Sequence, residues 1–242
     1  MVIEGRIGSV KKLKFILDTG VIHSVVDRRV IQKLHLPVHP AQILNVNKTV
    51  AIERATLPDM QFGPVQVTAI PVLVADLADF SEFATHVDAL IGMDLLRLNN
   101  LTIDNVAKKV LFDPLDKPAS ETSTKDDPVC MTAEVRLQDQ PVRLIVDTGL
   151  QGILLYEERV LNRIPDLTVA AKTEVDIGRR LRAKQLSISS ARLGSNEIDA
   201  KVWLVKGPPG NVLSGIDGFL GTSSLKARWI KFNFATNTLS WQ

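Results

Sequence analysis

The chain has 242 residues, 45% of them hydrophobic and 23% charged, which is the composition of a globular protein and excludes a disordered chain. Its net charge of +2 and its aromatic share of 5% give no basis for binding nucleic acid or an anionic membrane. Cys130 is the one cysteine, so an internal disulfide framework is excluded, and no apolar stretch is long enough to span a membrane.

The start of the chain gives no targeting signal. Residues 1–14 contain no continuous apolar segment, so we predict no signal peptide there. The compartment therefore stays open, and the periplasm or secretion remains an option if a targeting segment has been removed.

The first part of the chain reads as mainly β. Two short strands are predicted around a Gly8-Ser9 turn, and the second of them enters the tripeptide Asp18-Thr19-Gly20. A short amphipathic helix then ends before Pro37, β structure follows, and a second helical stretch precedes two closing strands. The predicted strands lie at 2–7, 10–17, 65–74, 101–104 and 109–112, and the helices at 27–34 and 93–98.

Residues 113–128 interrupt this pattern. Three prolines among serine, threonine, lysine and aspartate predict an exposed linker. We therefore expect an N-terminal lobe at 1–112 and a C-terminal lobe at 129–242.

The second part repeats the order of elements in the first. Strands are predicted at 132–137 and 142–146, followed by Asp147-Thr148-Gly149 and a short helix-like stretch at 154–161. Further strands are predicted at 169–177, 181–193, 198–205, 230–234 and 239–241. The sequence thus predicts two mostly-β lobes of equal size.

Asp-Thr-Gly occurs twice, each time at the exit of an apolar run, and each copy has a matching partner downstream. Leu90-Ile91-Gly92 follows the first copy and Phe219-Leu220-Gly221 follows the second. The interval from the aspartate to the final glycine is identical in the two cases (92 − 18 and 221 − 147). One such tripeptide is typical of a β-turn, but two copies at identical intervals indicate an internal repeat.

These motifs resemble the retropepsin-like (retroviral-type) aspartic proteases, in the single-chain, two-lobed form of their bacterial members. The resemblance covers nearly the whole chain outside the linker. It implies an all-β fold with short helices, in which two acid-protease lobes are related by a pseudo-twofold axis. It also implies that Thr19 and Thr148 lock the two catalytic loops together, and that each apolar-apolar-glycine segment packs against a catalytic loop.

The chemistry explains why two aspartates are needed. Peptide hydrolysis requires a base for the attacking water and an acid for the carbonyl oxygen and the leaving amine. Two close carboxylates cannot both ionise, so Asp18 and Asp147 would share one proton and supply both roles. Gly20 and Gly149 permit the tight loops that such an approach requires.

The expected function is an aspartic endopeptidase acting through Asp18 and Asp147, with no metal and no cofactor. The alternative is a catalytically impaired module that binds a peptide or a protein partner. Val21 and Leu150 favour this alternative, because the family usually has alanine or serine there. A third option is a lobe that pairs with a lobe of another molecule, although the linker favours pairing within one chain.

The expected substrate is a peptide or protein, bound by a monomer with an intramolecular pseudo-dimer. We predict that apolar residues after the two loops line the cleft, together with Gly178 of a second flap. The histidines show no metal-binding spacing. The predicted substrate-binding residues are Val21, Ile22, Leu150, Ile153 and Gly178.

Overall fold

The computed structural model describes residues 1–45, 48–78, 86–115, 130–164, 168–176, 180–207 and 213–242. The chain forms two compact units. Unit 1 comprises Met1–Ile43, Ala51–Met131 and Ala227–Gln242, and unit 2 comprises Leu44–Val50 and Thr132–Lys226. Residues 116–129, which hold most of the expected linker, lie outside the described residues.

The all-β class is confirmed. Strands dominate the described residues, and no α-helix among them is longer than α1. None of these helices is long and apolar enough to cross a membrane. The helical segments are α1 (Arg28–Lys33), α2 (Met93–Leu96), α3 (Glu157–Val160) and the 3-10 helix η1 (Thr222–Leu225).

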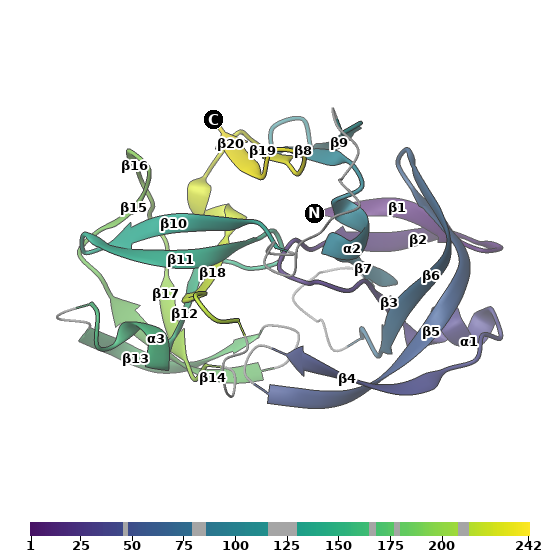
Figure 1. The fold of residues 1–242 in the computed structure, drawn as a ribbon, viewed down its shortest axis with the longest axis horizontal. Coiled ribbons are helices and arrows are strands. Elements are labelled where there is room, and N and C mark those ends of the chain that lie inside the picture. The colour runs from purple at the N-terminus through teal and green to yellow at the C-terminus, as the bar shows by residue number, and fades with distance from the viewer. Residues whose placement is uncertain (46–47, 79–85, 116–129, 165–167, 177–179, 208–212) are drawn as a thin grey trace. The chain divides into compact units, whose positions relative to one another are not determined.

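Unit 1 is built on a seven-stranded sheet in the order β1-β2-β7-β3-β6-β5-β4. An additional pairing of β1 with β5 curls the sheet back on itself, as Figure 1 shows on its right-hand side. The strands are β1 (Val2–Ile7), β2 (Val10–Leu17), β3 (Val25–Asp27), β4 (His39–Asn45), β5 (Lys48–Phe62), β6 (Val65–Ala75) and β7 (Ala89–Ile91).

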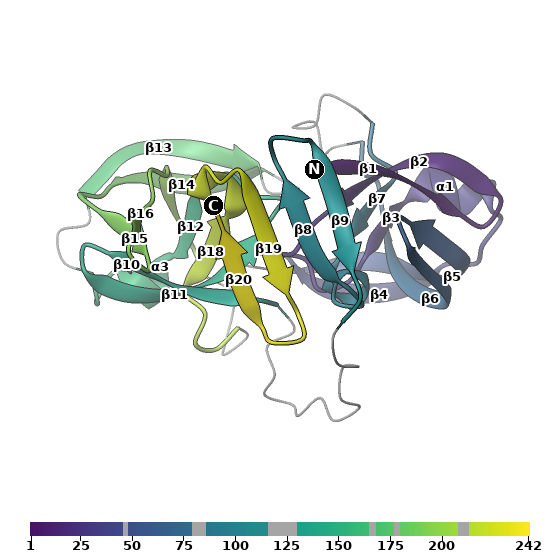
Figure 2. The same ribbon diagram turned by 90° about the horizontal axis from the view of Figure 1, so that it is seen from above.

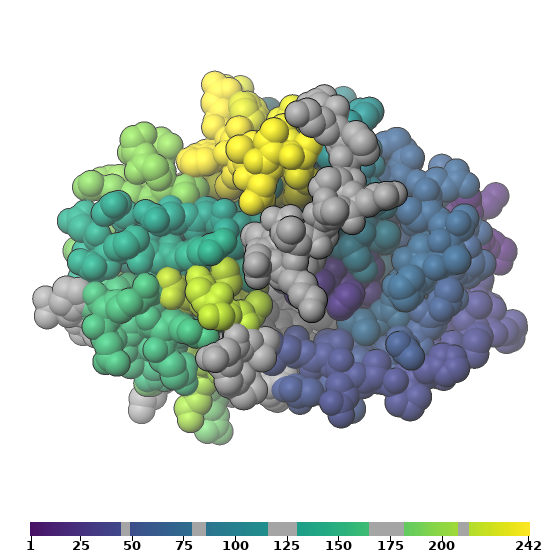
Figure 3. All heavy atoms as spheres, in the orientation of Figure 1, coloured from purple at the N-terminus to yellow at the C-terminus, as the bar shows by residue number. Residues whose placement is uncertain are grey.

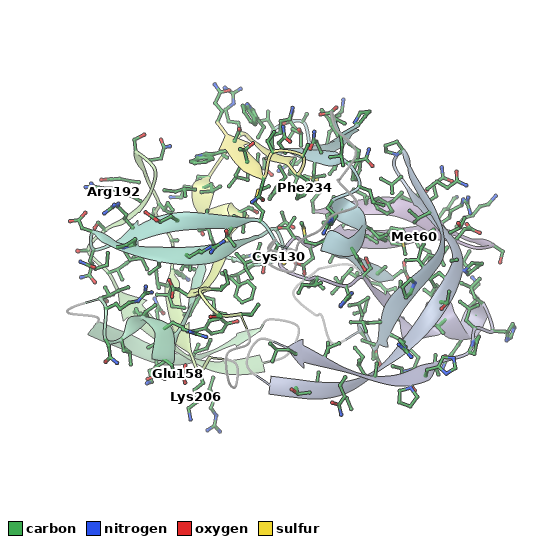
Figure 4. The ribbon with its side chains drawn as sticks, viewed as in Figure 1. Met60, Cys130, Glu158, Arg192, Lys206 and Phe234 are labelled. Atoms are coloured by element: carbon green, nitrogen blue, oxygen red, sulfur yellow. The ribbon has the colours of Figure 1, made fainter. Side chains whose placement is uncertain are left out.

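The core of unit 1 forms because alternate strand residues face inward. Phe15, Leu57 and Met60 are fully buried, and Met60 is labelled in Figure 4. Phe62 packs edge-on against Phe15 and Phe112, with ring centroids 6.3 and 5.7 Å apart. In the space-filling view the blue spheres of β5 and β6 lie on the outer surface of unit 1 (Figure 3).

A four-stranded sheet in the order β20-β19-β8-β9 completes unit 1 (Figure 2). The pairing of β19 with β8 is antiparallel, with Phe232 opposite Leu101 and Ile230 opposite Ile103. All four of these side chains are buried, so β19 contributes apolar core residues to unit 1. The strands are β8 (Asn100–Asp104), β9 (Lys109–Asp113), β19 (Trp229–Asn233) and β20 (Thr238–Trp241).

Unit 2 is built on a nine-stranded sheet in the order β13-β14-β17-β12-β18-β11-β10-β15-β16. At its centre β11 runs parallel to β18, which is antiparallel to β12. In unit 1 the strands β2, β7 and β3 have the same arrangement. The strands are β10 (Thr132–Leu137), β11 (Gln140–Asp147), β12 (Ile153–Tyr156), β13 (Thr168–Asp176), β14 (Arg180–Ser187), β15 (Ala191–Leu193), β16 (Asn196–Glu197), β17 (Val202–Val205) and β18 (Gly218–Gly221).

One predicted helix is shorter than expected. The stretch 154–161 is helix-like in the sequence throughout, but Ile153–Tyr156 forms β12 and only Glu157–Val160 forms α3. All four residues of β12 are buried, between β17 and β18. A short run in which every residue is apolar shows neither the strand period nor the helix period. The sequence pattern therefore could not distinguish a buried strand from a buried helix at 153–156.

Candidate active site

The loop that carries Asp18 follows directly from β2. The Asp18 amide donates to the Ile91 carbonyl of β7 at 3.0 Å, which fixes the start of the loop. The Gly20 amide donates to Asp18 Oδ1 at 3.0 Å, so the carboxylate is held by its own loop. A hydrogen bond from a backbone N–H to a carboxylate oxygen fixes the direction of the side chain.

The loop that carries Asp147 is built in the same way within unit 2. Asp147 is the last residue of β11 and lies opposite Gly221 of the parallel strand β18. The Gly149 amide donates to Asp147 Oδ1 at 2.6 Å. Asp147 is only 7% exposed, so its carboxylate is largely removed from water.

Two glycines make room for the backbone that follows each aspartate. A Cβ on Gly92 would lie 2.9 Å from the Val21 carbonyl oxygen. A Cβ on Gly221 would lie 2.2 Å from the Leu150 carbonyl oxygen. Real Cβ atoms do not approach backbone this closely, so each position requires glycine for the loop to keep its path.

The other segments named in the two motifs lie in the same places within their units. Leu90 and Ile91 belong to β7, and Phe219 and Leu220 belong to β18. The first threonine, Thr19, is fully buried, and Thr148 is half-buried.

A second pair of aspartates supports the two loops, and the motif search did not find it. Asp88 Oδ2 accepts the Lys14 amide at 2.8 Å, and Asp217 Oδ2 accepts the Arg143 amide at 2.9 Å. The two donors are separated by the same number of residues as the two acceptors (143 − 14 = 217 − 88 = 129). The two motif aspartates have this separation too (147 − 18 = 129), and it is called the repeat offset below. The signal in the sequence was an aspartate four positions before each motif glycine.

Two backbone hydrogen bonds, one in each unit, are also separated by the repeat offset. The Asp27 amide donates to the Asp88 carbonyl at 2.9 Å, and the Tyr156 amide donates to the Asp217 carbonyl at 2.8 Å. The strand that follows each loop is therefore tied to its motif segment by the same kind of bond.

The predicted substrate-binding residues differ in exposure. Ile22 is 38% exposed and Val21 is half-buried, so both offer surface beside the first loop. Leu150 is 7% exposed and belongs to an apolar cluster with Tyr156. Ile153 is fully buried in β12 and offers no surface to a substrate here. Gly178 lies outside the described residues.

Sequence reasoning also missed Ser24 and Asp94, which join the first loop to α2. Asp94 Oδ2 accepts the Ser24 amide at 2.9 Å, and its Oδ1 accepts the Ser24 hydroxyl at 2.7 Å. Ser24 Oγ in turn accepts the Gly92 amide at 3.0 Å. The available signal was an aspartate two positions after the motif glycine.

Asp27, at the end of the strand that follows the first loop, is almost fully buried. Burial alone would raise the pKa of Asp27, but hydrogen bonds from Arg29 and Leu77 outweigh it and the pKa lies below its ordinary value. In unit 2 the residue at the repeat offset is Tyr156, where burial raises the pKa of the phenol. Within the described residues, no group of three or more His, Cys, Asp or Glu side chains is placed to hold a metal.

The comparison with protein families adds one finding. Residues 3–95 match the family model described as aspartyl protease. The resemblance to the aspartic proteases is thereby confirmed. The matched segment contains the Asp18 loop, the motif glycine Gly92 and the missed Asp94. No curated protein matches the chain. The family match supports aspartic protease activity in general terms.

Proposed function

We propose that the chain is an aspartic endopeptidase, and that Asp18 and Asp147 form one site that hydrolyses peptide bonds. The observation that carries the proposal is the matched geometry of the two loops. In each, one carboxylate oxygen accepts the amide of the glycine two positions on, at 3.0 Å for Asp18 and 2.6 Å for Asp147. The matched loops support the proposal because they hold both carboxyl groups in the same way, and a pair of carboxyl groups that shares one proton can act as acid and base.

The proposed reaction uses one proton held between the two carboxyl groups. The ionised aspartate removes a proton from water as the water oxygen attacks the carbonyl carbon. The protonated aspartate gives its proton to the carbonyl oxygen, which forms a tetrahedral diol. The first aspartate then protonates the amine as the C–N bond breaks, and a diol hydroxyl returns a proton to the second. The pair ends with the single proton it began with.

The proposed substrate is a peptide with large apolar residues beside the cut. Ile22 and Val21 present apolar surface within the loop that carries Asp18. Burying a large apolar side chain is worth about 1.5–3 kcal/mol, which is enough to dominate selection at one position. A mixed peptide library should therefore be cut next to large apolar residues, and products dominated by charged flanking residues would contradict this.

The test of the shared site is a set of Asp→Asn variants. Asp18→Asn and Asp147→Asn keep the shape of each loop but remove the carboxyl chemistry. Each should abolish cleavage of the library, and the double variant should be no worse than either single variant, because residues that act as a unit are not additive. The matched control is Asp199→Asn, at an aspartate whose side chain is 88% exposed and paired with Lys226, and this variant should keep wild-type activity.

Two outcomes would overturn the proposal. A single variant that keeps about half of the activity would mean two independent sites, since removing one of two equal sites leaves the other. Activity unchanged in both variants would place the chemistry elsewhere.

The second candidate function is a binding module without turnover. It is favoured by Leu150, which lies where the family usually has alanine or serine, and which is buried among apolar side chains. A hydroxyl at that position could donate to a carboxylate, whereas leucine cannot. Tight binding of a transition-state mimic such as pepstatin, with no cleavage of the library, would support this candidate over the first.

A further inference from the structure

The loop that carries Asp18 continues as far as Ser24, and its second half lies on the start of α2. The Met93 amide donates to the Val21 carbonyl at 2.8 Å, and the Asp94 amide donates to the Ile22 carbonyl at 3.0 Å. Close contact is possible because Gly92 has no side chain. The backbone contact alone leaves open which side chains hold the loop in this position.

Ser24 and Asp94 complete the contact. Ser24 is fully buried, and its amide and hydroxyl form three hydrogen bonds: both donate to Asp94 oxygens, and Oγ accepts the Gly92 amide. The distances are 2.9, 2.7 and 3.0 Å. A carboxylate is suited to this role because it accepts at both oxygens. Bonds to a charged acceptor are also stronger than neutral ones.

Unit 2 does not have this pair. At the repeat offset, Ser24 corresponds to Ile153 and Asp94 to Ser223 (153 − 24 and 223 − 94). An isoleucine side chain has no hydrogen-bonding group, and the Ser223 hydroxyl donates to the Leu150 carbonyl at 3.4 Å. The side chains that hold the two loops therefore differ: the Asp94 carboxylate and the Ser24 hydroxyl bond the first, whereas Leu150 of the second belongs to an apolar cluster.

We propose that Ser24 and Asp94 are positioning residues, which hold the loop 18–24 so that Asp18 keeps its reactive geometry. The inference rests on the proposed function and adds that the two halves of the site are not equivalent. Neither residue touches the reacting atoms in this proposal. They act through the loop backbone, so their loss should lower kcat more than it raises KM.

The main experiment compares Ser24→Ala and Asp94→Ala with a structural control. Asn100→Ala removes a buried polar side chain of the same unit, which accepts the Phe234 amide at 2.9 Å away from the Asp18 loop. All three variants should lose thermal stability. Only the two loop variants should lose kcat, by roughly 10- to 100-fold, because small misplacement of a catalytic group has effects of that size.

A conservative variant separates positioning from packing. In Asp94→Asn the amide oxygen can accept the Ser24 amide and the NH2 group can donate to Ser24 Oγ, so the two-point contact persists with one bond reversed. Its kcat should lie closer to wild type than that of Asp94→Ala. Asp94 is only half-buried, so its variants should fold even if Ser24→Ala does not. The comparison of Asp94→Asn with Asp94→Ala then tests the positioning role by itself.

Hydrogen exchange of the backbone gives a measurement that does not need activity. Peptides that cover residues 18–24 should exchange faster in Ser24→Ala and Asp94→Ala than in wild type. In Asn100→Ala their exchange rate should equal that of wild type. If wild type cleaves nothing, the proposed function fails while faster exchange still supports the positioning role. The positioning role would be overturned if both loop variants kept the kcat and the exchange rates of wild type. It would also be overturned if Asn100→Ala lost as much kcat as the loop variants.

Discussion

At the scale of single residues, the chemistry of the candidate site depends on which groups donate to each carboxylate. Asp18 and Asp147 each accept an amide from their own loop, whereas Asp94, Asp88 and Asp217 accept from neighbouring strands or loops. Carboxylates that accept backbone amides stabilise the fold because they satisfy donors that would otherwise lack a partner. The same residue type therefore has both a structural and a proposed catalytic use in this chain.

The first prediction concerns Asp27, which caps α1 and accepts bonds from Arg29 and from the Leu77 amide at 2.8–3.0 Å. Asp27→Asn keeps a good helix cap but loses the charge. We expect the free energy of unfolding at neutral pH to fall by about 1–3 kcal/mol. Urea unfolding measures this, with Asp199→Asn as the exposed control.

The pH dependence of that loss has a definite sign. The pKa of Asp27 is lowered in the folded state, so its stabilisation is fully present above the ordinary value of 3.8. It is lost as the pH falls through the lower, folded value. The difference between wild type and Asp27→Asn should therefore shrink below pH 3.8, and a difference that grows in acid would contradict the assignment.

At the scale of elements, each loop is positioned by a three-strand arrangement rather than by one strand. In unit 1 β2 is parallel to β7 and β7 is antiparallel to β3, and in unit 2 β11, β18 and β12 repeat this order. The parallel pair brings the aspartate of one strand beside the glycine at the end of the other. In both units the same number of residues separates the aspartate from the glycine. The chain that connects the ends of the two parallel strands therefore has the same length in each unit.

The second prediction tests the contribution of β19 to unit 1. Phe232 is fully buried opposite Leu101 of β8, although the two strands lie far apart along the chain. Phe232→Ala should lower the free energy of unfolding by about 3–5 kcal/mol through the lost apolar contact and the cavity. Leu111→Ala, at a 51% exposed site on β9, should change it by less than about 0.5 kcal/mol.

Hydrogen exchange locates the effect of Phe232→Ala. Amides of β8 should lose protection because their antiparallel partner β19 packs less firmly. Unchanged protection at Asn100–Asp104 would show that β19 does not support this part of unit 1.

At the scale of the whole molecule, the proposed site needs one aspartate from each unit of the same chain. A covalent connection raises the effective concentration of one unit near the other to about the millimolar range, far above usual assay concentrations. The site should therefore not depend on association between molecules.

The third prediction follows from this connection. Specific activity should stay constant when the protein is diluted through the nanomolar range, and gel filtration should give a monomer near 26.6 kDa. Specific activity that falls steadily on dilution would instead indicate that units of two molecules pair to make the site.

The sequence by itself determined the features that depend on local pattern. The first two strands were predicted at 2–7 and 10–17, where β1 and β2 lie, because alternation of apolar and polar residues is a local property. The match at residues 3–95 confirms the aspartic protease resemblance that the Asp-Thr-Gly motif and its glycine partner suggested. The proposed pairing of Asp18 with Asp147 remains a prediction from that repeat.

Only the tertiary structure decided which distant residues meet. The bond between Ser24 and Asp94 and the pairing of β8 with β19 both join segments far apart in the sequence, and no local period encodes either of them. The strand at Ile153–Tyr156 was decided in the same way, since it is a strand because β17 and β18 flank it. A buried apolar run satisfies its backbone bonds with whichever partners the fold brings beside it, and those partners lie far along the chain.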